Sequence, residues 1–203
     1  MNELLPLSEL LKTHTQPRHS VLDKRIMQLK PFANYVHYQS FLRMQLRLHS
    51  AVEPIYQDAV LMGLIPRLKD RCRTRAVLLD CADLSIPEVL QLDDQHVAGA
   101  ITITDPYIGL GWLYTVEGST LGAAMLLKHV KHSLNLSEHN GARHMTSHAN
   151  GRTKHWRAFK EAINALSLTK DQRERVVEGA NQAFAFALES VEATMAQPEK
   201  ETA

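Results

Sequence analysis

Residues 111 to 124 read GWLYTVEGSTLGAA, and two of their glycines, Gly118 and Gly122, stand one helical turn apart. The surrounding residues are typical of a helix, yet each glycine inside a helix costs roughly 0.5–1 kcal/mol relative to alanine, because its freer backbone loses more entropy on folding. Steps of four residues drift by only about 40° around a helix, so Tyr114 and the two glycines share one face. The stretch therefore predicts a helix whose face is bulky at Tyr114 and bare beyond it.

A bare helical face lets another group approach the backbone closely, and two kinds of group are candidates. The first is a neighbouring helix, because small residues four apart are common where two helices touch. The second is a flat ligand lying against exposed backbone, where the glycines would also allow the helix to bend. The spacing of Gly118 and Gly122 taken alone favours the helix contact.

Length, charge and cysteine content limit the class of protein. The chain has 203 residues, enough for one hydrophobic core, so we expect a single domain over residues 1–203 with a frayed tail at 197–203. A formal net charge of +1 gives no general attraction for nucleic acid or an anionic membrane, which favours a small molecule or a protein as the partner. Cys72 and Cys81 have no metal or disulfide spacing, and no signal segment or membrane-spanning run is visible. We expect a soluble, cytoplasmic protein that is a monomer.

Apolar residues recur at three- and four-residue steps nearly throughout, which predicts an all-α fold of seven or eight helices. Ser8, Asp105 followed by Pro106, and Thr169 are the expected helix starts, and Pro31 ends the first helix. The segment between Cys81 and Asp105 carries the weakest signals. The expected helices cover residues 8–30, 35–62, 66–79, 106–134, 153–166 and 169–196, with a shorter helix after Pro87.

Among the 11 histidines, His19 has the strongest claim to a functional role. It lies in TQPRHSVLDKRIM, with Leu22 and Ile26 three and seven residues later on the same helical face. A neutral imidazole that points toward apolar surroundings needs a polar partner or a metal. The sequence has neither a zinc spacing such as H-E-x-x-H nor the G-x-S-x-G of a serine hydrolase, so these two kinds of site are not indicated.

With His19 added, GWLYTVEGSTLGAA resembles the distal-helix signature of bacterial heme oxygenases, of the iron-acquisition type found in pseudomonads and neisseriae. Other stretches agree with this family, and the poorest match lies between Leu64 and Thr104. These stretches are PRHSVLDKRIMQLKPFA around His19, GARH followed by GR and W..F within residues 141–159, and EGANQAF at residues 178–184.

The resemblance implies an all-α fold that holds heme between a proximal helix and a kinked distal helix. His19 would be the axial ligand of the heme iron, and Gly118 and Gly122 would be the catalytic glycines that rest over the porphyrin. Asp23 follows His19 by one turn and could orient its other ring nitrogen, as carboxylates do for metal-bound histidines. Related sequences often have glutamate at this position, and aspartate is shorter.

The same resemblance implies that heme is both cofactor and substrate and is oxidised by O2 to biliverdin, carbon monoxide and ferrous iron. No histidine or arginine lies between Tyr114 and Gly122, whereas a peroxidase uses such side chains to split an O–O bond. Lys12, two turns before His19, would bind a heme propionate, and a lysine there together with Tyr114 resembles the members that produce the IXα isomer of biliverdin. Met27 stands where some relatives have a second basic group, and Lys128 or His129 could supply another contact.

The chain shows no glycine-rich dinucleotide fingerprint, so we expect no bound flavin or nicotinamide and a separate electron donor. A ferredoxin, flavodoxin or reductase would dock near the heme edge, with basic residues near Lys128 and Arg152 as contacts. Two alternatives remain open on the sequence. One is a heme carrier or storage protein with the same fold, and the other is an unrelated helical protein in which the glycines only pack.

Overall fold

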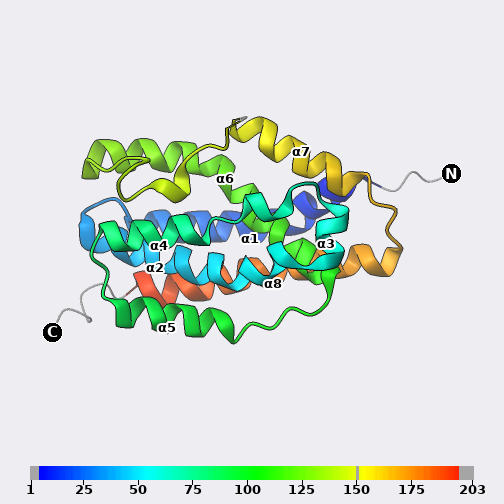
Figure 1. The fold of residues 1–203 in the computed structure, drawn as a ribbon, viewed down its shortest axis with the longest axis horizontal. Coiled ribbons are helices and arrows are strands. Elements are labelled where there is room, and N and C mark those ends of the chain that lie inside the picture. Colours follow the sequence, from blue (N-terminus) through cyan, green and yellow to red (C-terminus); the bar gives the residue numbers. More distant parts are fainter. Residues whose placement is uncertain (1–4, 150, 197–203) are drawn as a thin grey trace.

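The computed structural model describes residues 5–149 and 151–196 and is helical over most of their length (Figure 1). Its α-helices are α1 (Leu7–Gln28), α2 (Tyr35–Val52), α3 (Ala59–Leu64), α4 (Thr74–Asp83), α5 (Glu88–Gly99), α6 (Pro106–Leu134), α7 (Arg152–Asn164) and α8 (Lys170–Met195). Short 3-10 helices lie between them: η1 (Glu53–Gln57), η2 (Leu68–Arg71) and η3 (Arg143–Met145). The all-α prediction is confirmed for these residues, and the expected frayed tail at 197–203 lies outside them. None of the helices in the described ranges is long and apolar enough to cross a lipid bilayer.

The helix that carries the glycines begins and ends where the sequence predicts. The Asp105 carboxylate accepts hydrogen bonds from the amides of Tyr107 and Ile108, at 2.7 and 3.2 Å, while Pro106 occupies the first turn. These contacts satisfy amides that have no partner within the helix. At the other end the chain leaves the helix through Asn135 in the left-handed conformation, with φ of 52°. Local chemistry therefore fixes both ends of α6.

Two predicted helices are interrupted in the structure. The helix expected over residues 35–62 stops at Val52, because Pro54 has no amide to donate and η1 replaces the α-helix there. Asp58 then starts α3 by accepting a hydrogen bond from the amide of Leu61, at 2.8 Å. The helix expected over residues 66–79 is likewise divided into η2 and α4, and Arg67 just before η2 has a positive φ of 55°. These predictions were wrong because the apolar period continues through the breaks.

Ser8 is not the cap of the first helix, because α1 begins one residue earlier, at Leu7. Its amide instead donates a 2.9 Å hydrogen bond to Oδ1 of Asn164, and Nδ2 of Asn164 donates to the Ser8 hydroxyl at 3.0 Å. This reciprocal pair joins the start of α1 to the end of α7.

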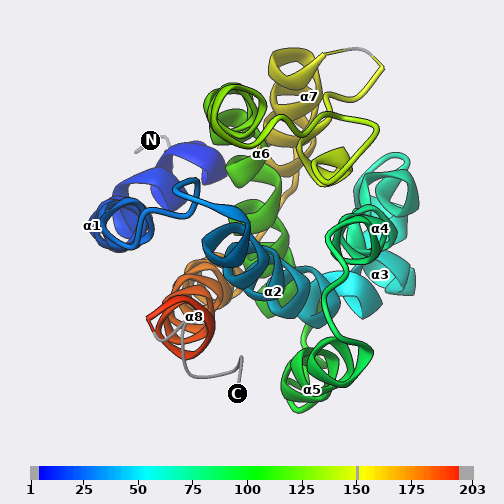
Figure 2. The same cartoon turned by 90° about the vertical axis from the view of Figure 1, so that its left-hand side faces the viewer.

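The helix α8 packs against α1, α2 and α6, and its contact with α6 is a direct approach of two backbones (Figure 2). A Cβ atom added to Gly111 would lie 2.1 Å from a backbone oxygen of α8, and one added to Gly179 would lie 2.0 Å from a backbone oxygen of α6. No side chain larger than hydrogen fits at such distances. Gly111 and Gly179 are thus the close helix contact, rather than the Gly118 and Gly122 pair that the spacing argument favoured.

Buried apolar side chains form two clusters, one at each end of the bundle. The first lies among the early parts of α1, α6 and α8, and the second among α2, α4 and the late parts of α6 and α8. The buried apolar residues of α6 belong to the first cluster up to Val116 and to the second from Leu127 onward. The segment with Gly118 and Gly122 lies between the two cores.

The helix α6 bends within its length, since its late part is seen end-on in Figure 2 while its early part runs down across the view. Two hydroxyls bind backbone carbonyls near the glycines: Ser119 donates to Val116 and Thr120 donates to Glu117, both at 2.7 Å. Hydroxyl groups that bind the preceding turn bend helices, and glycine offers little resistance to the bend. The kinked helix implied by the family resemblance is therefore present.

Candidate functional site

An electrostatic interaction and a ring contact relate α1 to α6. Near the start of α1, burial raises the pKa of the Tyr114 hydroxyl of α6 to about 12, and the Glu9 carboxylate of α1 adds to this rise in pKa. Just beyond the end of α1, the Phe32 ring stacks on His129 of α6, with ring centroids 5.7 Å apart and an interplanar angle of 7°. The two helices therefore run side by side, although both pack on α8 rather than closely on each other.

This alignment puts His19 and the two glycines in the same interval along the two helices. His19 stands 10 residues after Glu9, and Gly118 and Gly122 stand 4 and 8 residues after Tyr114. All three lie in the interval between these two interactions. We call the space between this part of α1 and this part of α6, with α8 beneath it, the slot.

His19 presents one ring nitrogen that no described residue engages. The ring is edge-on to Phe184 of α8, with centroids 5.8 Å apart, and Nδ1 lies 3.4 Å from Oδ2 of Asp23. Nε2 takes part in neither contact, and 56% of the His19 side chain is exposed. A neutral imidazole in this state can bind a metal through Nε2. The separation to Asp23 is at the long end for a hydrogen bond, so this carboxylate orients the ring only weakly.

The face of α6 that carries Tyr114, Gly118 and Gly122 is covered at Tyr114 and open at Gly122. Tyr114 is buried beneath Trp156 of α7, with ring centroids 5.4 Å apart. A Cβ atom on Gly118 would meet the edge of the same indole at 3.5 Å, whereas one on Gly122 would meet nothing within 4 Å. Neither glycine is in close contact with a neighbouring helix backbone: the Trp156 indole packs beside Gly118, and the missing side chain of Gly122 leaves open space. That space suits a flat ligand.

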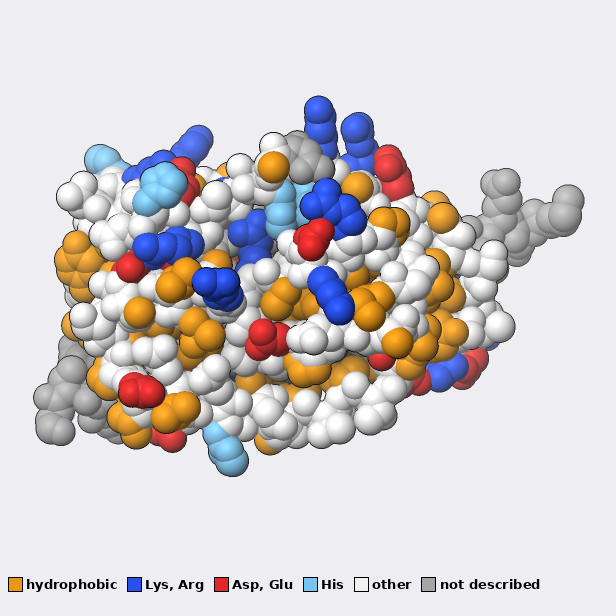
Figure 3. Space-filling view, viewed as in Figure 1, with side chains coloured by type: hydrophobic (Ala, Val, Ile, Leu, Met, Phe, Trp, Pro, Cys, Tyr) orange, Lys and Arg blue, Asp and Glu red, His pale blue; other side chains and the backbone are white. Residues whose placement is uncertain are grey.

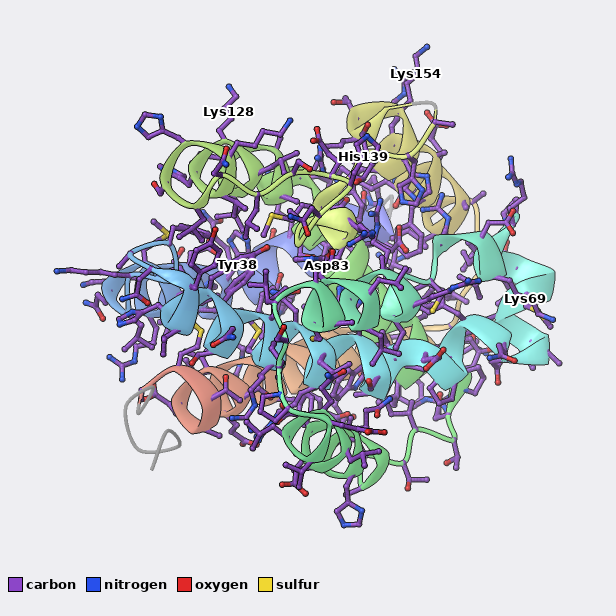
Figure 4. All side chains as sticks on the ribbon, turned by 60° about the vertical axis from the view of Figure 1, so that its left-hand side comes forward. Tyr38, Lys69, Asp83, Lys128, His139 and Lys154 are labelled. Atoms are coloured by element: carbon purple, nitrogen blue, oxygen red, sulfur yellow. The ribbon has the colours of Figure 1, made fainter. Side chains whose placement is uncertain are left out.

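The predicted basic contacts do not all face the slot. Lys12 is exposed on α1, one turn after Glu9. Lys128 projects away from the bundle in Figure 4, while His129 turns toward Phe32. Of the two alternatives on α6, His129 is therefore the one beside α1.

Arg152, expected near the docking surface of an electron donor, contributes to the fold. Its guanidinium donates to the backbone carbonyls of Thr120, at 3.2 Å, and Met145. Burial lowers its pKa. The side chain links the start of α7 to the glycine segment of α6, and its charge is committed to these carbonyls.

Sequence analysis missed a buried polar group behind the glycines, which we call the Glu117 cluster (Tyr56, Arg71, Glu117 and His155). The Glu117 carboxylate, 2% exposed, accepts hydrogen bonds from Tyr56 at 2.9 Å and from Arg71 at 2.7 Å. Nε2 of His155 lies 2.8 Å from Nη1 of Arg71 and 3.3 Å from Oε2 of Glu117. Burial opposes ionisation of Glu117, but His155, Arg71 and Tyr56 together outweigh it and lower its pKa. The sequence signal was an acidic residue within the apolar run before Gly118, where a buried charge needs partners.

The slot has the features that a heme-binding site requires. One wall offers an unengaged imidazole nitrogen from His19, and the other offers bare backbone at Gly122 with open space in front of it. Phe184 of α8 lies beside His19, and Tyr114 is covered by Trp156 at the start of the glycine face. The residues therefore fit a flat, largely apolar ring with a central metal.

Known proteins resemble this chain over most of its length. The family profile described as heme oxygenase matches residues 94–193. Heme oxygenase PigA of Pseudomonas aeruginosa is 33% identical over 178 residues, which are 87% of this chain and 87% of that protein. The NO- and CO-bound heme oxygenase of Neisseria meningitidis superposes with a TM-score of 0.82 at 36% identity and covers 95% of this chain and 94% of its own.

A more distant structure has the same fold. Heme oxygenase-1 of Synechocystis, solved in complex with heme, has a TM-score of 0.74 at 19% identity and covers 97% of this chain and 95% of its own. The family profile begins after α1, but the similarity to PigA spans 87% of the chain. The chain therefore belongs to the heme oxygenase family, whose members are enzymes that degrade heme.

Proposed function

We propose that this protein binds heme in the slot between α1 and α6 and oxidises it to biliverdin, carbon monoxide and ferrous iron, with O2 and electrons from a separate donor. The observation that supports the proposal is that α1 offers a ring nitrogen of His19 without a contact to a described residue, while α6 has open space in front of Gly122. Bound heme would supply both the iron that activates O2 and the porphyrin carbon that is oxidised.

Residues of α1 would bind the heme iron. His19 would bind the iron through Nε2, while Asp23 and the ring of Phe184 limit rotation of the imidazole. A carboxylate near the other ring nitrogen of a metal-bound histidine also makes the histidine a stronger ligand. This contribution is small here, because 61% of the Asp23 side chain is exposed.

Residues of α6 shape the opposite side. Tyr114, Gly118 and Gly122 offer no group that exchanges a proton near neutral pH, since the Tyr114 pKa of about 12 keeps its hydroxyl protonated. Such a side does not assist cleavage of an O–O bond as the acids and bases of peroxidases do. Bare backbone at Gly118 and Gly122 can instead crowd oxygen toward the porphyrin rim, while water delivers protons.

We further propose that the product is biliverdin IXα. Lys12 on α1 is exposed and within two turns of His19, so its ammonium can reach a propionate, and Tyr114 fills one end of the slot. Together they would fix the rotation of heme and so choose the carbon that is attacked. Chromatographic separation of the biliverdin isomers tests this assignment, and mainly β or δ product would overturn it.

The electron donor is proposed to be a ferredoxin, flavodoxin or reductase with an acidic surface. Lysine and arginine side chains gather on the upper part of the face in Figure 3, over α6 and α7. Lys128 and Lys154 project outward from these two helices in Figure 4. A positive surface steers an acidic partner and makes its association sensitive to salt.

We propose that the protein is a monomer with a single domain and that it works in the cytoplasm. Cys72 and Cys81 are both free thiols, as expected in a reducing compartment. Size-exclusion chromatography coupled to light scattering tests the monomer.

The decisive experiment adds hemin to the purified protein and follows the absorption spectrum. A Soret band that forms at one equivalent shows specific binding. Loss of that band on addition of reductant and O2, with growth of a biliverdin band, supports the enzyme. A Soret band that persists under the same conditions would instead identify a heme carrier, and no stoichiometric binding would exclude both.

A further inference from the structure

We propose that Glu117 is a positioning residue that, through Arg71 and His155, holds Trp156 against Gly118 and thereby sets the rotation of heme in the slot. This proposal rests on the proposed function for its final step only. The step that concerns the position of α7 belongs to the heme-free protein.

Two pairs of adjacent residues meet where α6 and α7 cross. Glu117 and Gly118 are adjacent in α6, and His155 and Trp156 are adjacent in α7. On one side of this crossing His155 lies 3.3 Å from the Glu117 carboxylate, and on the other side the Trp156 indole would lie 3.5 Å from a Cβ atom on Gly118. A movement that separates the polar pair therefore also moves the aromatic wall.

The Glu117 cluster joins three further elements to α6 in a place that excludes water. Tyr56 comes from η1, Arg71 from η2 and His155 from α7, and the side chains of Arg71 and Glu117 are 7% and 2% exposed. Arg71 also lies over the Phe159 ring of α7, 5.3 Å from its centroid, and its Nη2 donates to the His155 carbonyl at 3.4 Å. Removing one partner would leave a buried polar or charged group of the cluster without its partner in a low dielectric. The cluster is therefore a strong constraint on the start of α7.

The far end of α7 is fixed separately. Asn164 and Ser8 exchange hydrogen bonds of 2.9 and 3.0 Å, so α7 is held to α1 at its end and to α6 at its start. Trp156 lies near the α6 end, where it also covers Tyr114. Loss of the Glu117 cluster would thus loosen the end of α7 that lines the slot, where the hydrogen bond from Arg152 to the Thr120 carbonyl remains, while the Asn164 end stays attached.

The position of Trp156 matters because this side chain helps to close the slot at the Tyr114 end. Tyr114 and Trp156 fill the space beside Gly118, and the space in front of Gly122 is open. A heme ring pushed toward the filled end meets the indole edge, which restricts the rotations that it can adopt. With Trp156 displaced, more than one rotation fits, and a second rim carbon comes under attack.

The first test uses the heme-free protein and hydrogen exchange across residues 152–164. Glu117→Gln keeps the shape of the side chain but removes the charge that pairs with Arg71. The matched control is Asp94→Asn, because Asp94 is fully buried and pairs with Arg43 and Arg47 at 2.7 and 2.6 Å, between α5 and α2. We expect exchange near Trp156 to accelerate by roughly tenfold or more in Glu117→Gln, since a lost buried partner exceeds the ~1.4 kcal/mol that equals a factor of ten. Unchanged exchange, or the same acceleration in Asp94→Asn, overturns the proposal.

The second test measures the biliverdin isomers made by each variant. Glu117→Gln and Trp156→Phe should both raise the share of minor isomers, and the Asp94→Asn control should leave the distribution as in the wild type. If Glu117→Gln does not fold, Tyr56→Phe removes one hydrogen bond from the cluster and should shift the distribution in the same direction. An unchanged distribution in Trp156→Phe and in the cluster variants overturns the role in orientation. A wild-type protein that makes no biliverdin refutes the proposed function instead, and the exchange experiment still decides whether Glu117 holds α7.

Discussion

Gly111 of α6 and Gly179 of α8 bring the backbones of the two helices into direct contact, each glycine facing a carbonyl oxygen of the other helix. This contact fixes the early part of α6 within the first apolar cluster. The helix then bends, and the segment with Gly118 and Gly122 passes between the two clusters without a close helix partner. Gly111 and Gly179 thus allow two helices to pack closely, whereas Gly118 and Gly122 leave part of the surface of α6 without side chains.

Neither Gly111 nor Gly179 should tolerate an added methyl group. In Gly179→Ala the new Cβ would lie 2.0 Å from a backbone oxygen that cannot turn aside, so the helices must separate. We expect the free energy of unfolding of the heme-free protein to fall by about 3 kcal/mol or more, at the upper end for overpacked cores. Urea denaturation measures the change. Gly63→Ala is the control, since a Cβ there meets nothing within 4 Å, and it should stabilise α3 by up to about 1 kcal/mol.

Gly122→Ala should separate folding from function. The heme-free protein has open space in front of Gly122, so alanine should leave the free energy of unfolding unchanged or raise it by roughly 0.5–1 kcal/mol through helix propensity. The same methyl group would enter the space proposed for heme, and we expect hemin affinity or turnover to fall by about tenfold, equivalent to ~1.4 kcal/mol. A variant that binds and degrades hemin like the wild type would show that heme does not lie against this backbone.

Local signals allowed several features to be predicted from the sequence. Asp105 with Pro106 fixed the start of α6, and Thr169 with Gln172 forms a capping box that starts α8. These signals act within a few residues, and so they are visible without tertiary structure. The breaks at Pro54 and Asp58 were missed because apolar residues continue through them.

Long-range partners could not be predicted in the same way. Spacing identified Gly118 and Gly122 as a bare pair, but Gly111 meets Gly179, which is 68 residues away and lies in another helix. Likewise Glu117 obtains its partners from η1, η2 and α7, so its burial follows from tertiary packing.

His19→Ala should abolish heme degradation or reduce it severely. Removal of a group that supports a metal-bound histidine typically lowers metal affinity or activity by roughly 10–100-fold. Removal of the ligand itself should lower activity by more than this. Turnover and the Soret spectrum of the hemin complex measure the effect. His14→Ala is the matched control, because His14 is also exposed on α1 but lies five residues, or about 140° around the helix, from His19. This variant should behave as the wild type. Near-normal turnover in His19→Ala would remove His19 from the site.

His49 should make the protein less stable in acid. The ring is buried and its Nδ1 has no hydrogen-bond partner among the residues that the structure describes. Burial, together with the electrostatic effects of His144 and Arg73, lowers the pKa of His49 to about 3 from 6.5. Between these values the unfolded chain binds a proton that the folded protein does not, so the free energy of unfolding falls by up to ~1.4 kcal/mol per pH unit as the pH drops. Urea denaturation at pH 6.5, 5.5 and 4.5 would show a shallower dependence in His49→Gln, roughly by that amount per pH unit. The stability of His49→Gln should still depend partly on pH, because burial also lowers the pKa of His148, to about 4. Parallel curves for the wild type and His49→Gln would show that His49 takes up no extra proton on unfolding.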